Sequence, residues 1–153
     1  MTPRAHSCLI SWEPISERLI TTRFRSRVRN IKLLHCYDPT EKSSVNDKDD
    51  FYNLLAAKVP RGDIILVMGD LNAKVDADRT TLKHVLSNQD IGIRNDNGEK
   101  FVDFCNTNHL VIGGTVFQHK PRHKISWISR NVRDQNQIDY FAITRRFRGC
   151  LQD

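Results

Sequence analysis

An acid and a carboxamide follow directly after a strand-length apolar run in this chain of 153 residues. The run is Ile64–Met68, and a glycine comes next. Asp70 and Asn72 then stand on either side of a leucine. A buried strand that ends in this way delivers polar groups to the rim of a sheet. In extended backbone the two side chains face one side, where an acid and an amide can hold a metal ion, a water or a phosphate oxygen.

A second acid lies inside a strand-like run near the other end of the sequence. Asp139 stands among apolar residues in the stretch 137–143. A carboxylate in such a run costs free energy unless it is paired or used. Two acids in such settings indicate a shared polar site. The alternative is that Asp70 and Asn72 are present only because they suit the turn after a strand.

Composition points to one folded domain without a membrane segment. The hydrophobic content of 39% and the charged content of 27% are typical of a soluble globular chain. The longest apolar run is far shorter than a membrane span, and the apolar patch after Arg4 is too short for a secretory signal. The four cysteines stand singly, which predicts free thiols in a reducing, nuclear or cytoplasmic compartment and no secretion. His119 and His123 have a zinc-like spacing, but no paired cysteines accompany them, so zinc is disfavoured.

The positive charge is concentrated near the two ends of the sequence. The chain carries a formal net charge of +6. Residues 1–40 hold seven Lys or Arg against three acids, and residues 117–149 hold eight against two. Two basic zones that meet in space form one surface that attracts phosphate. The alternative is ordinary solvated surface charge.

Strands and helices alternate along the chain, and this order predicts an α/β or α+β sandwich. Residues 17–24 and 30–37 are predicted strands joined by a basic hairpin, and the run at 64–68 is a third strand. Helices are predicted at 43–59, 80–86 and 101–106, with a turn at 95–98. A strand at 110–112, a glycine bend, a strand at 115–117 and a basic loop at 119–124 follow. The segments 125–129 and 137–144 are predicted to be antiparallel strands.

Four landmarks in order resemble the endonuclease/exonuclease/phosphatase superfamily. They are Tyr37-Asp38-Pro39, Gly69-Asp70-Leu71-Asn72, Ser126-Trp127 and Gln137-Ile138-Asp139-Tyr140. Within that superfamily the chain is most similar to endonuclease domains of LINE-type retrotransposons and their cellular relatives of the craniofacial development protein 2-like type. The resemblance covers about residues 9–147.

The resemblance implies a fold and a chemistry. The fold is a DNase I-like four-layer α/β sandwich, in which two sheets pack face to face and helices cover the outside. Its members hydrolyse phosphodiesters or phosphomonoesters with Mg²⁺ or Mn²⁺. A hard cation on carboxylates neutralises the charge that builds on phosphorus while an attacking water lies in line with the leaving oxygen. We therefore expect a metal-dependent DNA endonuclease.

The resemblance also implies catalytic roles for four residues. Asp70 would hold the metal ion and orient or deprotonate the water, and Asn72 would hydrogen-bond the phosphate or a water on the metal. Tyr37 would donate to a phosphate oxygen, and Asp139 would orient a histidine that contacts the phosphate. The alternatives are an ordinary strand-end aromatic for Tyr37 and a structural hydrogen bond for Asp139.

Several residues are expected to contact nucleic acid, and the nucleic acid is expected to be DNA. Asn97 is expected at the rim of the site. Trp127 lies either near the nucleic acid or, in the interpretation that we favour, in the core. Four basic residues are expected to contact phosphates, because such contacts position a backbone without reading its bases: Arg122, Lys124, Arg130 and Arg133. The sequence indicates no oligomeric state.

The sequence also departs from the family pattern. No strands with the family's asparagine and metal-binding glutamate precede Leu9, and no histidine follows His123. Asp38 stands where relatives place a small residue, and Asp76 stands where they often have glycine. We therefore expect residues 1–153 to form one partial domain, truncated at both ends, with a weakly bound metal and impaired hydrolysis. The alternatives are a non-catalytic nucleic-acid-binding remnant and, disfavoured, a phosphomonoesterase or lipid phosphatase.

Overall fold

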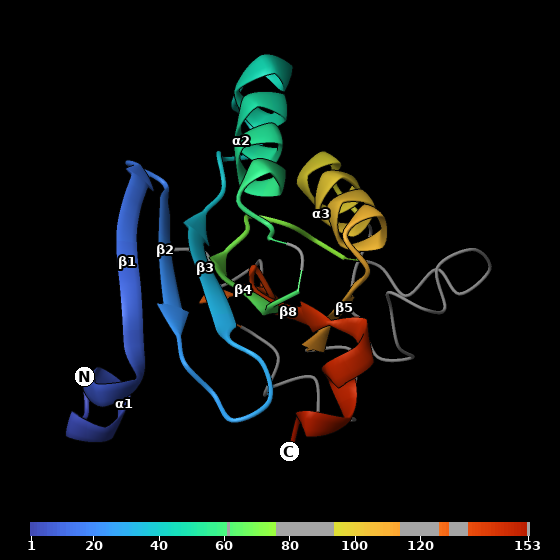
Figure 1. Cartoon of the computed structure of the whole chain (residues 1–153). Coiled ribbons are helices and arrows are strands. Elements are labelled where there is room, and N and C mark those ends of the chain that lie inside the picture. The colour runs from blue at the N-terminus through green and yellow to red at the C-terminus, as the bar shows by residue number, and fades with distance from the viewer. Residues whose placement is uncertain (61, 76–93, 114–125, 129–134, 153) are drawn as a thin grey trace.

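A six-stranded mixed sheet forms the framework of the molecule (Figure 1). The structure is a computed structural model that describes residues 1–60, 62–75, 94–113, 126–128 and 135–152. The strand order is β1-β2-β3-β4-β8-β5, and β6 and β7 form a separate two-stranded sheet. The bounds are α1 (Pro3–Cys8), β1 (Leu9–Ser16), β2 (Leu19–Phe24), β3 (Ile31–Tyr37), α2 (Val45–Ala57), β4 (Ile64–Asp70), α3 (Asp96–Thr107), β5 (Leu110–Ile112), β6 (Trp127–Ile128), β7 (Gln135–Asn136), β8 (Asp139–Thr144) and the 3₁₀ helix η3 (Arg145–Cys150).

The pair β3 and β4 is parallel, whereas the other pairs in the six-stranded sheet are antiparallel. Parallel neighbours need a crossover connection, and α2 provides it. Because the two strands run in the same direction, their carboxyl ends meet at one edge of the sheet. This geometry brings Tyr37 and Asp70 side by side.

The helix α2 begins with a capping box. Ser44 Oγ accepts a hydrogen bond from the backbone N–H of Asp47 at 3.1 Å, and the Asp47 carboxylate accepts one from the backbone N–H of Ser44 at 3.3 Å. This reciprocal pair satisfies two backbone donors at the start of the helix. The helix predicted over 43–59 is confirmed, with each end two residues shorter.

The helix α3 begins five residues before the predicted start. A turn was expected at 95–98, but Asn95 caps the helix and its Oδ1 accepts from the N–H of Gly98 at 2.9 Å. Asparagine suits an N-cap as well as a turn, so residue type alone does not separate the two. Gly98 also packs tightly, because a Cβ there would overlap the carbonyl oxygen of Lys74.

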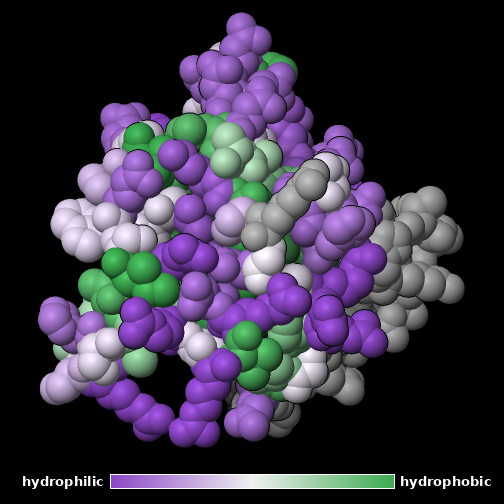
Figure 2. Space-filling view, viewed as in Figure 1, coloured by the Kyte–Doolittle hydropathy of each residue, from purple (hydrophilic) through white to green (hydrophobic). Residues whose placement is uncertain are grey.

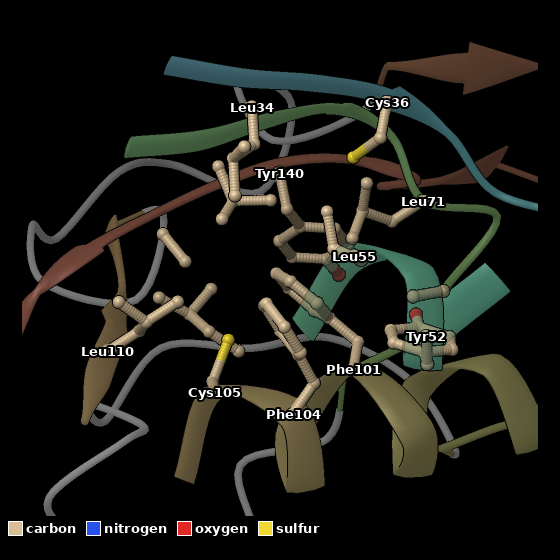
Figure 3. Close-up of a cluster of buried hydrophobic side chains, with 14 of the residues drawn as sticks. Leu34, Cys36, Tyr52, Leu55, Leu71, Phe101, Phe104, Cys105, Leu110 and Tyr140 are labelled. Carbon is tan, nitrogen blue, oxygen red and sulfur yellow. The ribbon is translucent and has the colours of Figure 1, made fainter. Parts of the chain in front are cut away.

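The hydrophobic core lies between the sheet and the helices α2 and α3, which cover the same face (Figures 1 and 3). The sheet contributes Leu34 and Val67, and the helices contribute Leu55 and Phe101, each of them fully buried. The two rings of Phe101 and Tyr140 lie 5.9 Å apart between centroids. Burial of such side chains is the main source of stability in a domain of this size.

One predicted strand pairing is wrong. The segments 125–129 and 137–144 do not pair with each other; β6 pairs with β7, and β8 lies between β4 and β5. The inner face of β8 carries Tyr140 and Ala142, both buried, and this face requires a place in the middle of the large sheet.

Other elements differ from the sequence-based expectation or fall outside what the structure describes. The elements α1, β1 and η3 were not predicted, and β1 and η3 are largely exposed, so their sequences show no clear periodicity. The expected helix at 80–86, the strand at 115–117 and the loop at 119–124 lie outside the described residues. The hairpin between the strands at 17–24 and 30–37 is confirmed.

The α/β fold class is confirmed. All four cysteines are free thiols, as predicted, and burial raises the pKa of the Cys36 thiol to about 12. Within the described part of the chain, no helix combines the length and apolar character needed to cross a membrane. The face shown in Figure 2 is mainly hydrophilic, with hydrophobic residues in small separate groups.

Candidate functional site

Tyr37, Asp70 and Asp139 lie in one row across three adjacent strands. Tyr37 is opposite Asp70 in the β3–β4 register, and Asp70 is opposite Asp139 in the β4–β8 register. Residues directly opposite one another project from the same face of a sheet. None of the three side chains is buried, and Tyr37 is 48% exposed. The row therefore presents a phenol and two carboxylates side by side at the edge where β3 and β4 end.

Asp70 ends β4 in a half-buried position. Burial raises the pKa of its carboxyl group first, the nearby Asp139 carboxylate raises it further, and a hydrogen bond from the backbone N–H of Asn72 opposes both. That bond is 2.9 Å from the Asn72 nitrogen to Asp70 Oδ1. A carboxylate whose proton affinity is raised is better suited to accept a proton from water.

Gly69 allows β3 and β4 to approach each other just before Asp70. Its φ is 143°, a conformation that other residues rarely adopt. A Cβ at this position would overlap the carbonyl oxygen of Cys36 on β3. The close approach at Gly69 is therefore between two strands of the protein itself.

Asn72 reaches the site by a different route from the one expected. Extended backbone was expected to place it beside Asp70, but its φ is 44°, in the left-handed region. This conformation is open to asparagine at little cost. The Asn72 Nδ2 donates to the carbonyl oxygen of Asp38 at 2.9 Å. A carboxamide nitrogen carries two hydrogens, so a second donor remains on this nitrogen.

Ser126 holds the backbone at Asp139 through hydrogen bonds. The backbone N–H groups of Ile138 and Asp139 both donate to Ser126 Oγ, at 3.0 and 3.1 Å. In addition, the N–H of Leu71 donates to the carbonyl oxygen of Ile138 at 2.9 Å. The Ser126-Trp127 landmark thus contributes a serine that fixes the backbone at the start of β8, a role that sequence reasoning did not assign.

Arg18 is a second residue that sequence reasoning missed. Its guanidinium carbon lies 5.4 Å from the centroid of the Tyr37 ring, and its carbonyl oxygen accepts from the N–H of Tyr37 at 2.9 Å. A guanidinium over an aromatic face attracts it. Arg18 therefore restrains the orientation of the phenol, and no motif in the sequence marks it.

The expected contact between Asn97 and nucleic acid is corrected, because its side chain is 0% exposed. The Asn97 Nδ2 donates instead to the carbonyl oxygen of Pro39 at 2.7 Å. Asn97 thus supports the Tyr37-Asp38-Pro39 segment from the core side.

The other expected nucleic-acid contacts are not placed. For Trp127 the backbone alone is described, in β6, opposite Asn136. The four basic candidates lie outside the described residues: Arg122, Lys124, Arg130 and Arg133. Their roles stay predictions.

Asp38 is a buried carboxyl group behind the site. Its Oδ2 accepts from the Tyr52 hydroxyl at 2.6 Å. Burial is the main reason why the pKa of this carboxyl rises to about 7, although the Tyr52 hydrogen bond and the charges of Lys48 and Arg18 lower it. The sequence marked Asp38 only as a departure from the family pattern.

The carboxylates of Asp70 and Asp139 are suitable ligands for a divalent cation. In the described parts of the chain, no group of three or more His, Cys, Asp or Glu side chains gathers in one place. Asp70 and Asp139 offer two neighbouring carboxylates whose like charges disfavour each other. Mg²⁺ is commonly bound through one or two carboxylates together with waters. The donor set is therefore chemically compatible with a hard cation.

Comparison with known proteins shows what the chain is similar to. No family model matches the chain. Two curated relatives, the craniofacial development protein 2 of Tragulus javanicus and that of Bos taurus, are each 29% identical over 152 residues. The match covers 97% of this chain but 26% and 25% of those proteins, so the chain spans about a quarter of their length.

Solved structures share the fold at low sequence identity. The AP endonuclease LMAP from Leishmania major has a TM-score of 0.60 and 16% identity, over 86% of this chain and 47% of that one. The 3′ phosphatase NExo from Neisseria, bound to a product DNA hairpin, has a TM-score of 0.59 and 13% identity, over 92% and 57%. The endonuclease domain of TRAS1, a telomere-specific non-LTR retrotransposon, has a TM-score of 0.52 and 14% identity, over 83% and 48%. The chain thus shares its fold with an AP endonuclease, a 3′ phosphatase and a retrotransposon endonuclease domain, and it resembles craniofacial development protein 2 in sequence.

Proposed function

We propose that this chain carries the site of a divalent-metal-dependent phosphodiester hydrolase that acts on DNA. The row of Tyr37, Asp70 and Asp139 across β3, β4 and β8 is the observation that supports the proposal most strongly. The sequence pattern predicts these residues to work together, and the strand registers make them neighbours. The fold is shared with an AP endonuclease and with a 3′ phosphatase bound to DNA, which is consistent with this chemistry.

The residues of the site divide the chemistry among them. Asp70 accepts the proton of the attacking water, and the Asp139 charge beside it increases the affinity of Asp70 for that proton. The Tyr37 hydroxyl and the second hydrogen on Asn72 Nδ2 donate to phosphate oxygens. Mg²⁺ or Mn²⁺ held by Asp70 would supply positive charge toward the phosphate.

The substrate is proposed to be DNA because of charge as well as fold. The chain has a net charge of +6, and its basic residues concentrate near the two ends of the sequence. A cationic surface attracts a polyphosphate backbone without regard to base sequence. Arg122, Lys124, Arg130 and Arg133 are proposed to contact this backbone.

A plasmid nicking assay tests the function. In Mg²⁺ the protein is expected to convert supercoiled plasmid to the nicked form, and EDTA is expected to stop the conversion. Asp70→Asn removes the proton acceptor and the charge that holds the cation, so nicking is expected to fall by about a hundredfold or more. Asp103→Asn removes a carboxylate on the exposed side of α3 and is expected to leave nicking unchanged. If the Asp70→Asn variant still nicks the plasmid, Asp70 is neither the proton acceptor nor the metal ligand.

The second candidate is a nucleic-acid binder without hydrolysis. It is favoured by the absence, among the described residues, of a cluster of three or more metal-ligating side chains. This candidate predicts DNA binding that weakens steeply with salt, because the bound cationic side chains displace counterions. Fluorescence anisotropy with a labelled duplex at several salt concentrations measures this. Binding without nicking favours the second candidate over the first, and binding that ignores salt contradicts it.

A further inference from the structure

We propose that Asp38 is a positioning residue of this site, which holds Asp70 and Asn72 through its backbone and ties both of them to α2 through its side chain. The proposal rests on the proposed function, in which Asp70 and Asn72 are working groups. Asp38 itself reaches neither the substrate nor the reacting atoms.

The backbone of Asp38 contacts both working residues. Its N–H donates to the carbonyl oxygen of Asp70 at 2.9 Å. Its carbonyl oxygen accepts from Asn72 Nδ2 at 2.9 Å. A shift of residue 38 therefore moves the end of β4 and reorients the carboxamide of Asn72 at the same time. The bond from the Asn72 N–H to Asp70 Oδ1, 2.9 Å long, closes this set of contacts.

The side chain of Asp38 anchors this backbone to the core. The carboxyl group is 0% exposed, and its Oδ2 accepts from Tyr52 at 2.6 Å. Tyr52 lies on α2, edge-on to Phe51 at 5.2 Å between ring centroids and 6.0 Å from Phe104. Figure 3 shows Tyr52 among the core side chains, on the same side of the cluster as Leu71. Because packed rings hold the hydroxyl in place, the carboxyl group has one defined position.

The cost of burial argues that this carboxyl group does more than fill space. A buried carboxyl costs free energy unless hydrogen bonds compensate for it. Of its two oxygens, Oδ1 has no hydrogen-bond partner among the described residues. A small apolar residue would fill the position at lower cost. A costly group with a defined geometry is consistent with a role in holding the site, as is seen for some buried polar groups in other proteins.

The segment that follows Asp38 is held in the same way. Asn97 donates to the carbonyl oxygen of Pro39 at 2.7 Å. Lys48, 2% exposed, donates to the carbonyl oxygen of Glu41 at 3.0 Å and to Asp96 Oδ2 at 2.7 Å. These contacts tie the segment to both helices, so a loss at Asp38 would act on Asn72 and Asp70 without unfolding the loop.

Steady-state cleavage of a short fluorescent DNA duplex in Mg²⁺ tests the proposal with four variants of the full chain. Asp38→Ala removes the anchor, and Tyr52→Phe removes only the hydroxyl that binds it. Both are expected to lower kcat by about tenfold to a hundredfold with KM within about twofold, because a small misplacement of working groups has effects of this size. Asp38→Asn keeps an oxygen that accepts from Tyr52 and is expected to stay within about threefold of wild type. Cys105→Ala, a buried change in α3, is the control and is expected to leave kcat unchanged.

A second readout does not depend on activity. The side-chain amide signals of Asn72 in a ¹⁵N–¹H NMR spectrum report the bond to the Asp38 carbonyl oxygen. They are expected to shift in Asp38→Ala and in Tyr52→Phe, and to stay in place in Cys105→Ala. If Asp38→Ala does not fold, Tyr52→Phe, which keeps the ring in the core, gives the answer alone.

The outcomes separate this proposal from the proposed function. Three results support the positioning role. In Tyr52→Phe the kcat falls while KM is unchanged, in Asp38→Asn the kcat stays close to that of wild type, and the Asn72 signals shift in Asp38→Ala and Tyr52→Phe. Equal kcat in Tyr52→Phe, Cys105→Ala and wild type overturns it. An inactive wild type overturns the proposed function alone. Asn72 signals that stay in place in both anchor variants overturn the positioning role whether or not the protein cleaves DNA.

Discussion

Gly69 stands one residue before Asp70 with a φ of 143°, and its α-carbon faces the carbonyl oxygen of Cys36 on the neighbouring strand. The position of Asp70 therefore depends on a residue without a side chain. Any Cβ at residue 69 would push β3 and β4 apart at the level of Tyr37 and Asp70. At the scale of the single residue, position 69 therefore leaves no room for a side chain.

Gly69→Ala is expected to lower the free energy of unfolding by about 3 kcal/mol or more, because both backbone strain and overlap oppose the methyl group. Gly62→Ala is the matched control. Gly62 also has a positive φ, of 99°, but a Cβ there would meet nothing within 4 Å. It is expected to cost about 1 kcal/mol from strain alone. Urea unfolding curves of the two variants measure the difference, and equal losses would contradict the role of the Cys36 carbonyl.

Asp38 gives the protein a pH-dependent stability. Burial raises the pKa of its carboxyl group to about 7 from an ordinary value of 3.8, against the Tyr52 hydrogen bond and the Lys48 and Arg18 charges, and with the Asp70 carboxylate adding to the rise. The folded protein thus holds this proton more tightly than the unfolded chain does. The stability from Asp38 is fully present below about pH 4, falls as the pH rises and is lost above pH 7.

Asp38→Asn is expected to remove this dependence, which amounts to at most about 1.4 kcal/mol per pH unit. The variant should therefore gain stability relative to wild type between pH 5 and pH 7. Urea unfolding at both pH values, with EDTA present, measures the change. Asp96→Asn is the contrast, because the hydrogen bond from Lys48 lowers the pKa of Asp96 below its ordinary value of 3.8, so this variant is expected to leave the change in stability between pH 5 and pH 7 as in wild type. Parallel pH profiles for wild type and Asp38→Asn would exclude Asp38 as the source.

At the scale of the element, β1 differs from the strands that carry the site. It is an edge strand whose residues are mostly exposed on both faces, including Trp12 at 64% exposure. The strands β3 and β4 lie inside the sheet and bury Leu34 and Val67 beneath α2 and α3. Few buried apolar contacts mean that β1 opens at low free-energy cost.

Backbone amides of β1 are accordingly expected to exchange with deuterium much faster than those of β3 and β4. Hydrogen exchange followed by mass spectrometry on peptides from Leu9–Ser16 and from Ile64–Asp70 measures this. Because the site lies on β3, β4 and β8, opening of β1 is expected to leave the nicking activity intact. Equal protection of the two peptides would show that something covers β1 in solution.

Elements with strong local signals were predictable from the sequence. The helix α2 has a capping box and a periodic apolar face, and β3 and β4 have apolar runs bounded by turn residues. The start of α3 was missed because asparagine caps helices as readily as it forms turns. The pairing of β8 was missed because contacts between distant segments leave no trace in local periodicity.

At the scale of the whole molecule, the site residues could be predicted but their connections could not. Residue types brought out Asp70, Asn72 and Asp139, the family resemblance added Tyr37, and the strand registers place three of these four in one row. Asn97 was expected at the rim of the site, whereas it is buried against Pro39. Arg18 and Ser126 act through a ring contact and through backbone bonds, which no sequence pattern encodes.

The fold is shared with longer proteins. This chain covers 47% of the AP endonuclease LMAP and 57% of the 3′ phosphatase NExo. The sheet, both core helices and the row of polar residues are nevertheless all present in the described part of the chain. The part of the fold that positions the row therefore lies within these residues.

The row exists only because β8 meets β4 in one particular alignment, with Asp139 across from Asp70. Side chains alternate along a strand, so sliding β8 by one position would turn Asp139 toward the helices and bring Ile138 or Tyr140 across from Asp70. Ser126 Oγ accepts hydrogen bonds from the backbone N–H groups of Ile138 and Asp139, and these two bonds favour this alignment. A single residue inserted between Asp139 and Ile143 would thus leave either Asp139 or the buried residues of β8 that follow it on the wrong face of the sheet.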